Sequence, residues 1–586
     1  MMTLEAQQEA ENFLNNEKQF HLGMLPTEQS NRKTDGLDLK FAGNAAEGVE
    51  MLLSVDRDVS EMAKKILAGP EFKHMVEVGS NAISEGRKIV FSGCGATGRL
   101  SILLESMWRS FFREISHKHP EIYDKTKMFE NSVFSIMTGG DYALIRSVEY
   151  FEDYQEFGRQ QVKEMNITAG DILIAISEGG ETSSVLGTVA EAADRGAKVF
   201  LLFNNPADIL SKHIERSRVA IEDPRVTVID LYCGPMALAG STRMQATTSE
   251  QLIAGAALES ILSNSFRSLL SHSQLKSLNI KEIDYAKEFD TLLDDLLAAS
   301  NTKTIGDYIK METNIYKSNG LVTYFANEFL MDIFTDTTER TPTFMLPPFK
   351  KFDDILAPPS WAFVKYPLLT TSATWEYVLG RQPRCLDWDI RLYKEMGSSA
   401  SIASAPPQID AIQIGKFLIG NEEDESRLSR TPNIAVNVVG SREVLSSAYK
   451  EYITAYDIFT EKFQSKTSLI IGKSVDNAKF QITCSPILSI LNLMEHMAVK
   501  LVLNTISTGT MVLMGRVTNN WMSWVDVTNK KLKDRGIRLI SEICELNYRD
   551  ACYALHESLE ELKIINQTSI EKFSPVQFTI QKYKQK

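Results

Sequence analysis

The stretch that decides the fold is KIVFSGCGATGRLSILLE, from Lys88 to Glu105. A short apolar run enters a loop with glycines at Gly93, Gly95 and Gly98, and a helical pattern follows at once. Glycines let the backbone approach a ligand closely, and free N–H groups at the start of a helix favour an anion. The stretch therefore predicts a strand, a loop and a helix that together hold an anionic group.

Four more apolar runs follow this stretch, and helical patterns separate them. The strand candidates of this first block are 88–93, 132–139, 171–177, 198–204 and 226–232. Strands that alternate with helices predict right-handed βαβ units and a parallel sheet covered on both faces. In such sheets ligands bind at the carboxyl ends of the strands, which is where the glycine loop lies.

A second block of the same kind follows a polar, helical stretch at about 262–310. Its strand candidates are 320–327, 361–367, 432–440, 467–473 and 479–485. Glycines mark the loops of this block less clearly. From Ile490 to the end the pattern is mostly helical, so the sequence predicts two α/β domains and a helical C-terminal region.

Composition excludes several classes of protein. The 586 residues carry a net charge of -13, which argues against nucleic-acid binding, since phosphate backbones need a basic footprint. No run of about 18 apolar residues predicts a membrane span, and the polar N-terminus has no secretory pattern. The six cysteines form no CxxC, and no His/Cys cluster indicates a metal. We expect a cytoplasmic protein without metal or cofactor.

Two further loops at strand ends carry hydroxyl groups. ISEGGETSS (176–184) follows the third strand candidate, and GSTRM (240–244) follows the fifth. A single hydroxyl-rich turn is more often a helix cap than a ligand site. Three such segments in one βαβ block favour an anion-binding site.

The anion is more consistent with a phosphate monoester than with a nucleotide. A dinucleotide site needs an acidic residue about 20 residues after the glycines, at the end of the next strand, but that strand starts some ~35 residues on. No Walker lysine follows the loop, which argues against a nucleoside triphosphate.

Several motifs resemble a known family. ISEGGETSS is similar to the phosphate loop of sugar isomerase (SIS) domains, which bind phosphosugars. LPTEQSN (25–31), GCGATGRL (93–100), TGGDYALIRSVEYFED (138–153) and GSTRMQATTSEQL (240–252) resemble successive motifs of N-acetylmuramic acid 6-phosphate etherases. Those enzymes are homodimers of one SIS domain, and the related glucokinase regulatory protein has two SIS domains and a helical lid.

The resemblance implies two SIS domains in tandem, which form an internal pseudo-dimer. The expected division is an N-terminal arm and helix (1–60), SIS domain 1 with the phosphosugar site (61–280), SIS domain 2 (281–495) and a helical lid (496–586).

The two halves resemble the family unequally. The etherases have a catalytic glutamate after the glycine loop, where the first half has Met107. The second half keeps the glutamate as Glu339, in DTTERTPTF (336–344), but its loop YFANEF has lost the glycines. Glu149 aligns with the other catalytic glutamate. The resemblance therefore implies one composite site, with Glu149 and Glu339 as an acid–base pair.

The residues that we expect to bind the ligand are Gly93, Gly95, Ala96, Thr97, Gly98, Ser177, Glu178, Gly179, Gly180, Glu181, Thr182, Ser241, Arg243 and Lys531. Lys531 aligns with a lid lysine of the regulatory protein. Structural roles remain open for several of these groups: Glu149 as a solvated helix carboxylate, Glu339 as a cap, Lys531 as surface charge and Arg243 as a loop support. Glu105 lies two residues from the missing carboxylate, which turns it about 200° away on a helix.

Three functions remain open at this point. The first is phosphosugar binding by a regulator that resembles the glucokinase regulatory protein, with a sugar kinase as its possible partner. The second is an N-acetylmuramic acid 6-phosphate etherase, a carbon–oxygen lyase that releases lactate. The third and weakest is an aldose–ketose isomerase, for which His496 is the candidate base, although a packed helix histidine is the simpler interpretation.

Overall fold

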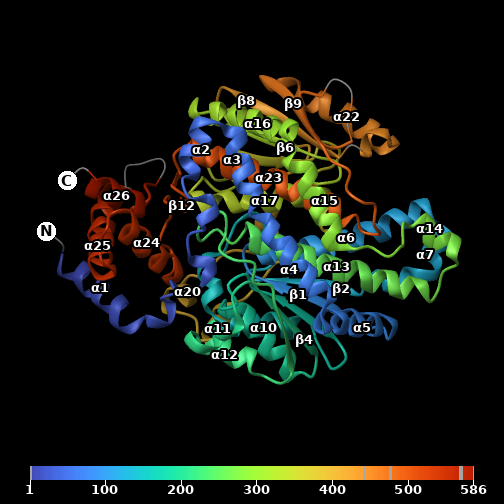
Figure 1. Cartoon of the computed structure of the whole chain (residues 1–586), viewed down its shortest axis with the longest axis horizontal. Coiled ribbons are helices and arrows are strands. Elements are labelled where there is room, and N and C mark those ends of the chain that lie inside the picture. Colours follow the sequence, from blue (N-terminus) through green and yellow to red (C-terminus); the bar gives the residue numbers. More distant parts are fainter. Residues whose placement is uncertain (1–2, 441, 474, 476–477, 566–571, 585–586) are drawn as a thin grey trace.

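The computed structural model describes residues 3–440, 442–473, 475, 478–565 and 572–584. Two five-stranded parallel sheets form the two halves of the molecule (Figure 1). The first contains β1 (Ile89–Gly93), β2 (Val133–Met137), β3 (Ile172–Ile176), β4 (Lys198–Phe203) and β5 (Val226–Asp230). The second contains β6 (Leu321–Phe325), β7 (Ala362–Lys365), β8 (Asn433–Gly440), β9 (Ser465–Gly472) and β10 (Phe480–Thr483). All ten predicted strands are therefore confirmed.

The two sheets share one topology. The strand order is β2-β1-β3-β4-β5 in the first sheet and β7-β6-β8-β9-β10 in the second. In the first sheet the strand order changes direction between β1 and β3, and in the second sheet between β6 and β8. In sheets of this kind, ligands bind at this switch point. The predicted fold class, two doubly wound parallel sheets flanked by helices in tandem, is confirmed.

The strands form because they are apolar on both faces. Every residue of β1 is buried. Ile89 and Phe91 pack into the larger core, which continues into the second half, whereas Val90 packs into a separate core on the other face. A strand buried on both sides reads as a continuous apolar run, which explains why the sequence located it.

The helices cover both faces of each sheet. Those before β1 are α1 (Leu4–Asn16), α2 (Leu37–Gly43), α3 (Ala45–Ser54), α4 (Asp56–Ala68) and α5 (Pro70–Ser84). The first domain adds α6 (Ala96–Lys118), α7 (Pro120–Thr126), α8 (Tyr142–Ile145), α9 (Gln155–Glu164), α10 (Ser183–Asp194), α11 (Ala207–His213), α12 (Glu215–Ile221) and α13 (Gln245–Arg267). α14 (His272–Ser277) follows α13 and lies beside α7 (Figure 1). The second domain adds α15 (Tyr285–Leu297), α16 (Ala299–Lys317), α17 (Leu330–Phe344), α18 (Thr371–Leu379), α19 (Ile390–Glu395), α20 (Ala400–Ser404), α21 (Ala411–Ile414) and α22 (Ser447–Phe459).

Long helices of both halves pack against one another between the two sheets. α23 (Leu493–Leu513) is buried along most of its length and packs against α13, α16 and α17, while α17 also packs against α6. The predicted lid, residues 496–586, thus starts inside a helix of the interior. The domain boundaries remain a prediction.

The remaining C-terminal helices form a separate lobe with the N-terminus. After the short hairpin of β11 (Val517–Thr518) and β12 (Trp521–Met522) come α24 (Lys530–Ile543), α25 (Tyr548–Ile565) and α26 (Pro575–Lys584). α1 packs against α25 in this lobe, so the two ends of the chain lie on the same side of the molecule (Figure 1).

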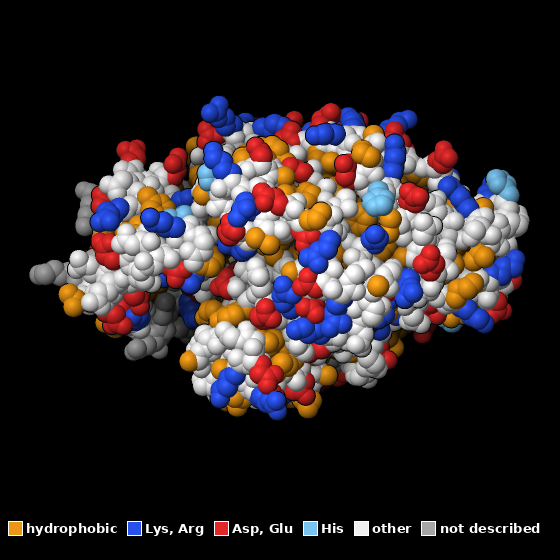
Figure 2. Space-filling view, turned by 90° about the horizontal axis from the view of Figure 1, so that it is seen from below, with side chains coloured by type: hydrophobic (Ala, Val, Ile, Leu, Met, Phe, Trp, Pro, Cys, Tyr) orange, Lys and Arg blue, Asp and Glu red, His pale blue; other side chains and the backbone are white. Residues whose placement is uncertain are grey.

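Charges are mixed on the surface. On the face shown in Figure 2, Lys and Arg side chains alternate with Asp and Glu side chains. Nucleic-acid backbones are bound by extended basic surfaces, and the described residues of this face form no broad basic area.

Candidate functional site

A cavity of about 160 Å³ opens at the carboxyl ends of the strands of the first sheet. Residues 94–96, after β1, and Glu178 and Thr182, after β3, form one part of its wall. Glu339 of α17 and Lys531 of α24 form another part. The cavity is therefore composite: the first domain, the second domain and the C-terminal lobe all contribute to it.

Four helices begin at this cavity. Ala96 is the first residue of α6, Thr182 directly precedes α10, residues 240–243 lead into α13, and Asn529 directly precedes α24. The first turn of each helix has N–H groups without intrahelical partners and a partial positive charge. Four such ends around one cavity favour an anion.

Glycines shape the loop between β1 and α6. Gly95 has a φ of +56°, a conformation that other residues rarely adopt. A Cβ atom on Gly93 would lie 2.4 Å from the carbonyl carbon of Thr97, so only glycine fits there. The Thr97 hydroxyl accepts from the N–H of Cys94 at 3.0 Å and donates to its carbonyl at 2.9 Å. Thr97 thus closes the loop and is not a lining residue of the cavity.

The second loop, 177–182, combines a hydroxyl pair with a salt bridge. Ser177 donates to the Thr182 hydroxyl at 3.3 Å, and only Thr182 of the two lines the cavity. Glu181 accepts from Lys531 Nζ at 2.5 Å. Burial disfavours the charge of Lys531, but Glu181 and Glu28 outweigh burial and raise its pKa. The lysine therefore stays a cation at the edge of the cavity.

Glu28, in the LPTEQSN segment, holds α24 over the cavity. Its two oxygens accept from Arg535 at 2.6 Å and from Arg538 at 2.7 Å. Burial opposes the charge of Glu28, yet these two arginines lower its pKa to about 2. Because Arg535 also lines the cavity, this bridge fixes part of the cavity wall.

Arg243 links the two domains beneath the cavity. It is 4% exposed and donates to Asp336 at 3.0 Å and to Thr508 at 2.7 Å. Burial lowers its pKa, while Asp336 counteracts that effect. Arg243 Nε and the hydroxyl of the neighbouring Ser241 have no hydrogen-bond partner among the described residues. Both residues line the cavity, and these two unpaired donors are buried in its wall.

Glu339 crosses from the second domain to the glycine loop of the first. It forms a buried ion pair with Arg99 of α6. Arg99 is itself held by the carbonyls of Leu144, at 3.1 Å, and Ala143, at 2.8 Å. The sequence motifs assign no role to Arg99. The one local indication of a role is that Arg99 directly follows Gly98, the last glycine of the loop.

Glu178 combines burial with a neighbouring carboxylate. Burial raises its pKa to about 7, and Glu339 contributes in the same direction. The Thr247 hydroxyl lies 3.2 Å from Glu178 Oε1. The sequence analysis placed Glu178 among the ligand-binding residues and did not identify it as an acid–base group, because burial of a loop side chain depends on the surrounding domains.

The predicted second catalytic glutamate lies at the edge of what the structure describes. Glu149 begins the short 3-10 helix Glu149–Asp153, and its side chain is outside the described part of the chain. Glu152 of the same helix lines the cavity, and Asn529 donates to it at 2.6 Å. Neither Glu152 nor Asn529 is among the residues that the sequence motifs predict for the site.

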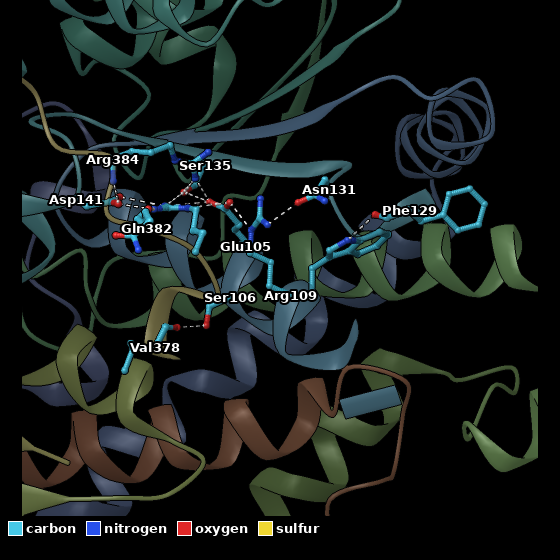
Figure 3. A network of polar contacts seen from close by, with 12 residues as sticks. Glu105, Ser106, Arg109, Phe129, Asn131, Ser135, Asp141, Val378, Gln382 and Arg384 are labelled. Carbon is cyan, nitrogen blue, oxygen red and sulfur yellow. Dashed lines mark hydrogen bonds and ion pairs between the residues drawn. The ribbon is translucent and has the colours of Figure 1, made fainter. Parts of the chain in front are cut away.

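Glu105 belongs to an ion network away from the cavity lining (Figure 3). It accepts from Arg109 at 2.8 Å and from Arg381 of the second domain at 3.0 Å, and it forms an ion pair with Arg384. Asp141 accepts from Arg381 at 2.5 Å. Burial opposes the charge of Glu105, but Arg381 and Arg384 lower its pKa to about 2. These contacts give Glu105 a structural role between the domains.

His496 pairs with Asp332. Its Nδ1 lies 2.9 Å from an Asp332 carboxylate oxygen, and although burial acts against it, Asp332 raises the pKa of His496. His496 is not a lining residue of the cavity.

The cavity thus brings together half of the predicted site residues. Those that line it are Gly95, Ala96, Glu178, Thr182, Ser241, Arg243, Glu339 and Lys531. The other predicted ligand-binding residues, which are not lining residues, are Gly93, Thr97, Gly98, Ser177, Gly179, Gly180 and Glu181.

Known proteins are similar to this chain in sequence. An N-acetylmuramic acid 6-phosphate etherase of Bacillus licheniformis is 31% identical over 236 residues, which cover 40% of this chain and 67% of the relative. The chain belongs to this SIS-domain family. Residues 72–193 also match the family described as the glucokinase regulatory protein N-terminal SIS domain. A second etherase of this family, from Bacillus subtilis, is 26% identical over 234 residues, 40% of this chain and 67% of the relative. The chain thus spans about two thirds of the length of these etherases.

Solved SIS-family structures are also similar. The C-terminal domain of a glucosamine-fructose-6-phosphate aminotransferase from Francisella tularensis has a TM-score of 0.43 at 11% identity, and covers 80% of this chain and 96% of its own. A tagatose-6-phosphate ketose/aldose isomerase from Escherichia coli has a TM-score of 0.42 at 10% identity, with 82% and 96% covered.

Two general features complete the description. Within the described ranges, no three His, Cys, Asp or Glu side chains are grouped so that they could hold a metal ion. No helix in the described part of the chain has the length and the apolar character needed to cross a membrane.

Proposed function

We propose that this SIS-family protein binds one phosphosugar, a hexose or amino-sugar 6-phosphate, in the composite cavity, and that it acts as a regulator resembling the glucokinase regulatory protein. The observation that carries the proposal is the convergence of four helix N-termini on one cavity. The phosphate would lie among these N-termini, near Thr182 and Lys531, and the free donors of Ser241 and Arg243 would bind the ligand as well.

Calorimetry with glucose 6-phosphate and N-acetylglucosamine 6-phosphate tests this proposal. Ser241→Ala removes one of the two free donors, so affinity should fall by about 1–3 kcal/mol, the range for a hydrogen bond to a charged group. Ser268→Ala is the matched control, because the Ser268 hydroxyl donates to the Ser265 carbonyl at the end of α13 and Ser268 does not line the cavity. Unchanged affinity in Ser241→Ala, or no binding by the wild type, would contradict the proposal.

The alternative is an N-acetylmuramic acid 6-phosphate etherase, which Glu339 at the cavity and the etherase relatives favour. Elimination of lactate needs one carboxylate to take the proton next to the carbonyl and one carboxylic acid to protonate the leaving oxygen. Lactate detection after incubation with N-acetylmuramic acid 6-phosphate decides between the two functions. Under the etherase alternative, Glu339→Gln abolishes lactate release, because glutamine has no acid–base proton. Under the regulator proposal, wild type releases none and Glu339→Gln changes sugar affinity alone.

The isomerase alternative has less support. Its candidate base, His496, is bonded to Asp332 and does not line the cavity. A regulator would also need a partner that responds to the ligand, and a sugar kinase is the partner class that we propose. Addition of this protein should inhibit a hexokinase of the same organism, and a phosphosugar should change that inhibition. Kinase activity that is unaffected at all sugar concentrations would remove the kinase from the proposal.

A cytoplasmic location is part of the same proposal. All six cysteines are free, and free thiols are typical of a reducing compartment.

A further inference from the structure

Glu178 is an unusual residue for a loop that receives an anion. It follows β3 directly after Ser177 and lines the cavity, and unlike Glu181 of the same loop it has no cation bonded to it among the described residues. A carboxylate at this point would repel a phosphate, since both are negative. The side chain is partly accessible, and what it reaches is the cavity that it lines.

The cations around Glu178 are occupied elsewhere. Each of them already donates to another acceptor. Lys531 donates to Glu181 at 2.5 Å, and Arg535 donates to Glu28 at 2.6 Å. Arg243 donates to Asp336 at 3.0 Å, and Lys500 donates to the Met244 carbonyl at 3.0 Å. The titratable groups that face Glu178 from the surrounding elements are Glu339 of α17, Glu152 of the 3-10 helix, Glu250 of α13 and the Cys94 thiol. No salt bridge between described residues includes Glu178, and Lys531, which acts against the rise in the pKa of Glu178, is itself bonded to Glu181.

The hydrogen bonds around Thr247 can serve Glu178 in both charge states. The Thr247 hydroxyl has two acceptors, Glu178 Oε1 at 3.2 Å and the Thr242 carbonyl at 3.1 Å. When Glu178 is ionised, the hydroxyl donates to it, and hydrogen bonds from Thr247 and Thr242 favour the charged form. When Glu178 carries a proton, the hydroxyl donates to the Thr242 carbonyl and its oxygen accepts from Glu178.

We propose that Glu178 takes up a proton when an anionic sugar phosphate enters the cavity, so that the site meets its ligand with one negative charge fewer. This inference rests on the proposed phosphosugar function. Burial and Glu339 raise the pKa of Glu178 to about 7, which places the change of charge near neutral pH. A phosphosugar adds negative charge beside Glu178 and raises that pKa further. An uncharged sugar brings no charge and causes no uptake.

The experiment is calorimetry of glucose 6-phosphate binding at pH 8 in two buffers with different ionisation enthalpies. The wild type should take up most of one proton per ligand, and its affinity should fall up to tenfold per pH unit between pH 7.5 and 9. The phosphate itself ionises near pH 6, below this window. Glu178→Gln keeps the shape without the titration, so its binding should depend neither on the buffer nor on pH in this range.

Glu222→Gln is the matched control, since Glu222 pairs with Arg218 on the surface and should retain the uptake of the wild type. Wild-type binding without proton uptake, or uptake that persists in Glu178→Gln, overturns the inference and leaves phosphosugar binding standing. If neither glucose 6-phosphate nor N-acetylglucosamine 6-phosphate binds at all, the proposed function fails, and this inference fails with it.

Discussion

The two domains have the same strand order but differ in two equivalent loops, the one after the first strand of each sheet and the one after the strand next to it. In the first domain, glycines open the loop after β1, and the loop after β3 ends in Thr182 at the cavity. In the second, residues 326–329 after β6 contain no glycine. The sheet therefore provides the place for a ligand, and the loops decide whether one fits.

The loop after β8 is filled by its own carboxyl group, that of Glu443, whose pKa burial raises well above its usual range. The first residue of β1, Ile89, pairs with Ile172 of β3, and the first residue of β6, Leu321, pairs with Asn433 of β8. Counting from these equivalent pairs, Glu443 of the second domain corresponds to Thr182 of the first. The Glu443 carboxyl group accepts from the backbone N–H of Gly440 at 2.8 Å, and the residue is 2% exposed. In place of a hydroxyl that faces a ligand, the second domain has a carboxyl group folded onto the backbone of the loop.

In the helices that follow β1 and β6, it is the second domain that contributes the glutamate to the cavity. α17 of the second domain delivers Glu339 to the cavity, whereas α6 of the first has Met107 at the aligned position, 5% exposed in the core. The two domains therefore contribute different parts of one cavity. Three measurements test this complementarity, from the largest expected effect to the smallest.

The largest effect on stability is expected from loss of the ion pair that links the two domains. Arg243→Met leaves Asp336 buried without its main cross-domain partner, and removal of one member of a buried pair costs about 3–5 kcal/mol of unfolding free energy. Urea denaturation measures the loss. Arg218→Met, which breaks only surface pairs with Glu215 and Glu222, should show no comparable loss. Equal stability of the two variants would mean that the domains do not depend on this link.

The ion pairs of Glu28 with Arg535 and Arg538 of α24 lie over the first domain. Their contribution to the free energy of unfolding should depend on pH. The pKa of Glu28 falls from 4.5 to about 2 on folding, so its contribution is present above pH 4.5 and is lost as pH falls toward 2. At 1.36 kcal/mol per pKa unit the contribution is about 3 kcal/mol. The difference in unfolding free energy between wild type and Glu28→Gln should shrink from pH 6 to pH 3. A constant difference would contradict this assignment.

The smallest effect is expected in the second domain. Glu443→Gln should leave sugar-phosphate affinity unchanged and the stoichiometry at one ligand per chain, because the residues after β6 lack the glycines that close backbone approach requires. Glu339→Gln, the same substitution at the cavity, should alter binding. Calorimetry of both variants provides the comparison, and two ligands bound per wild-type chain would show that the second loop is open.

Sequence patterns located the strands better than the side chains of the site. Buried parallel strands such as β1 leave a local signal, an apolar run that ends in glycine. The burial of Glu178 and the contact of Arg99 with Glu339 leave none, because each depends on residues far along the chain. α23 shows the same limit: its apolar pattern predicted a helix, but not that the helix lies in the core between the domains.

The placement of α24 has a consequence for the newly made chain. The first sheet and its glycine loop are complete once β5 has been synthesised, but Glu339 follows about a hundred residues later and Lys531 about three hundred. At 5–20 residues per second, synthesis continues for about 15 to 60 s after β5 before the last wall of the cavity exists. A phosphosugar that needs all of these walls cannot assist the early folding of the domain that presents most of its contacts. Its stabilising effect begins only when translation is almost finished.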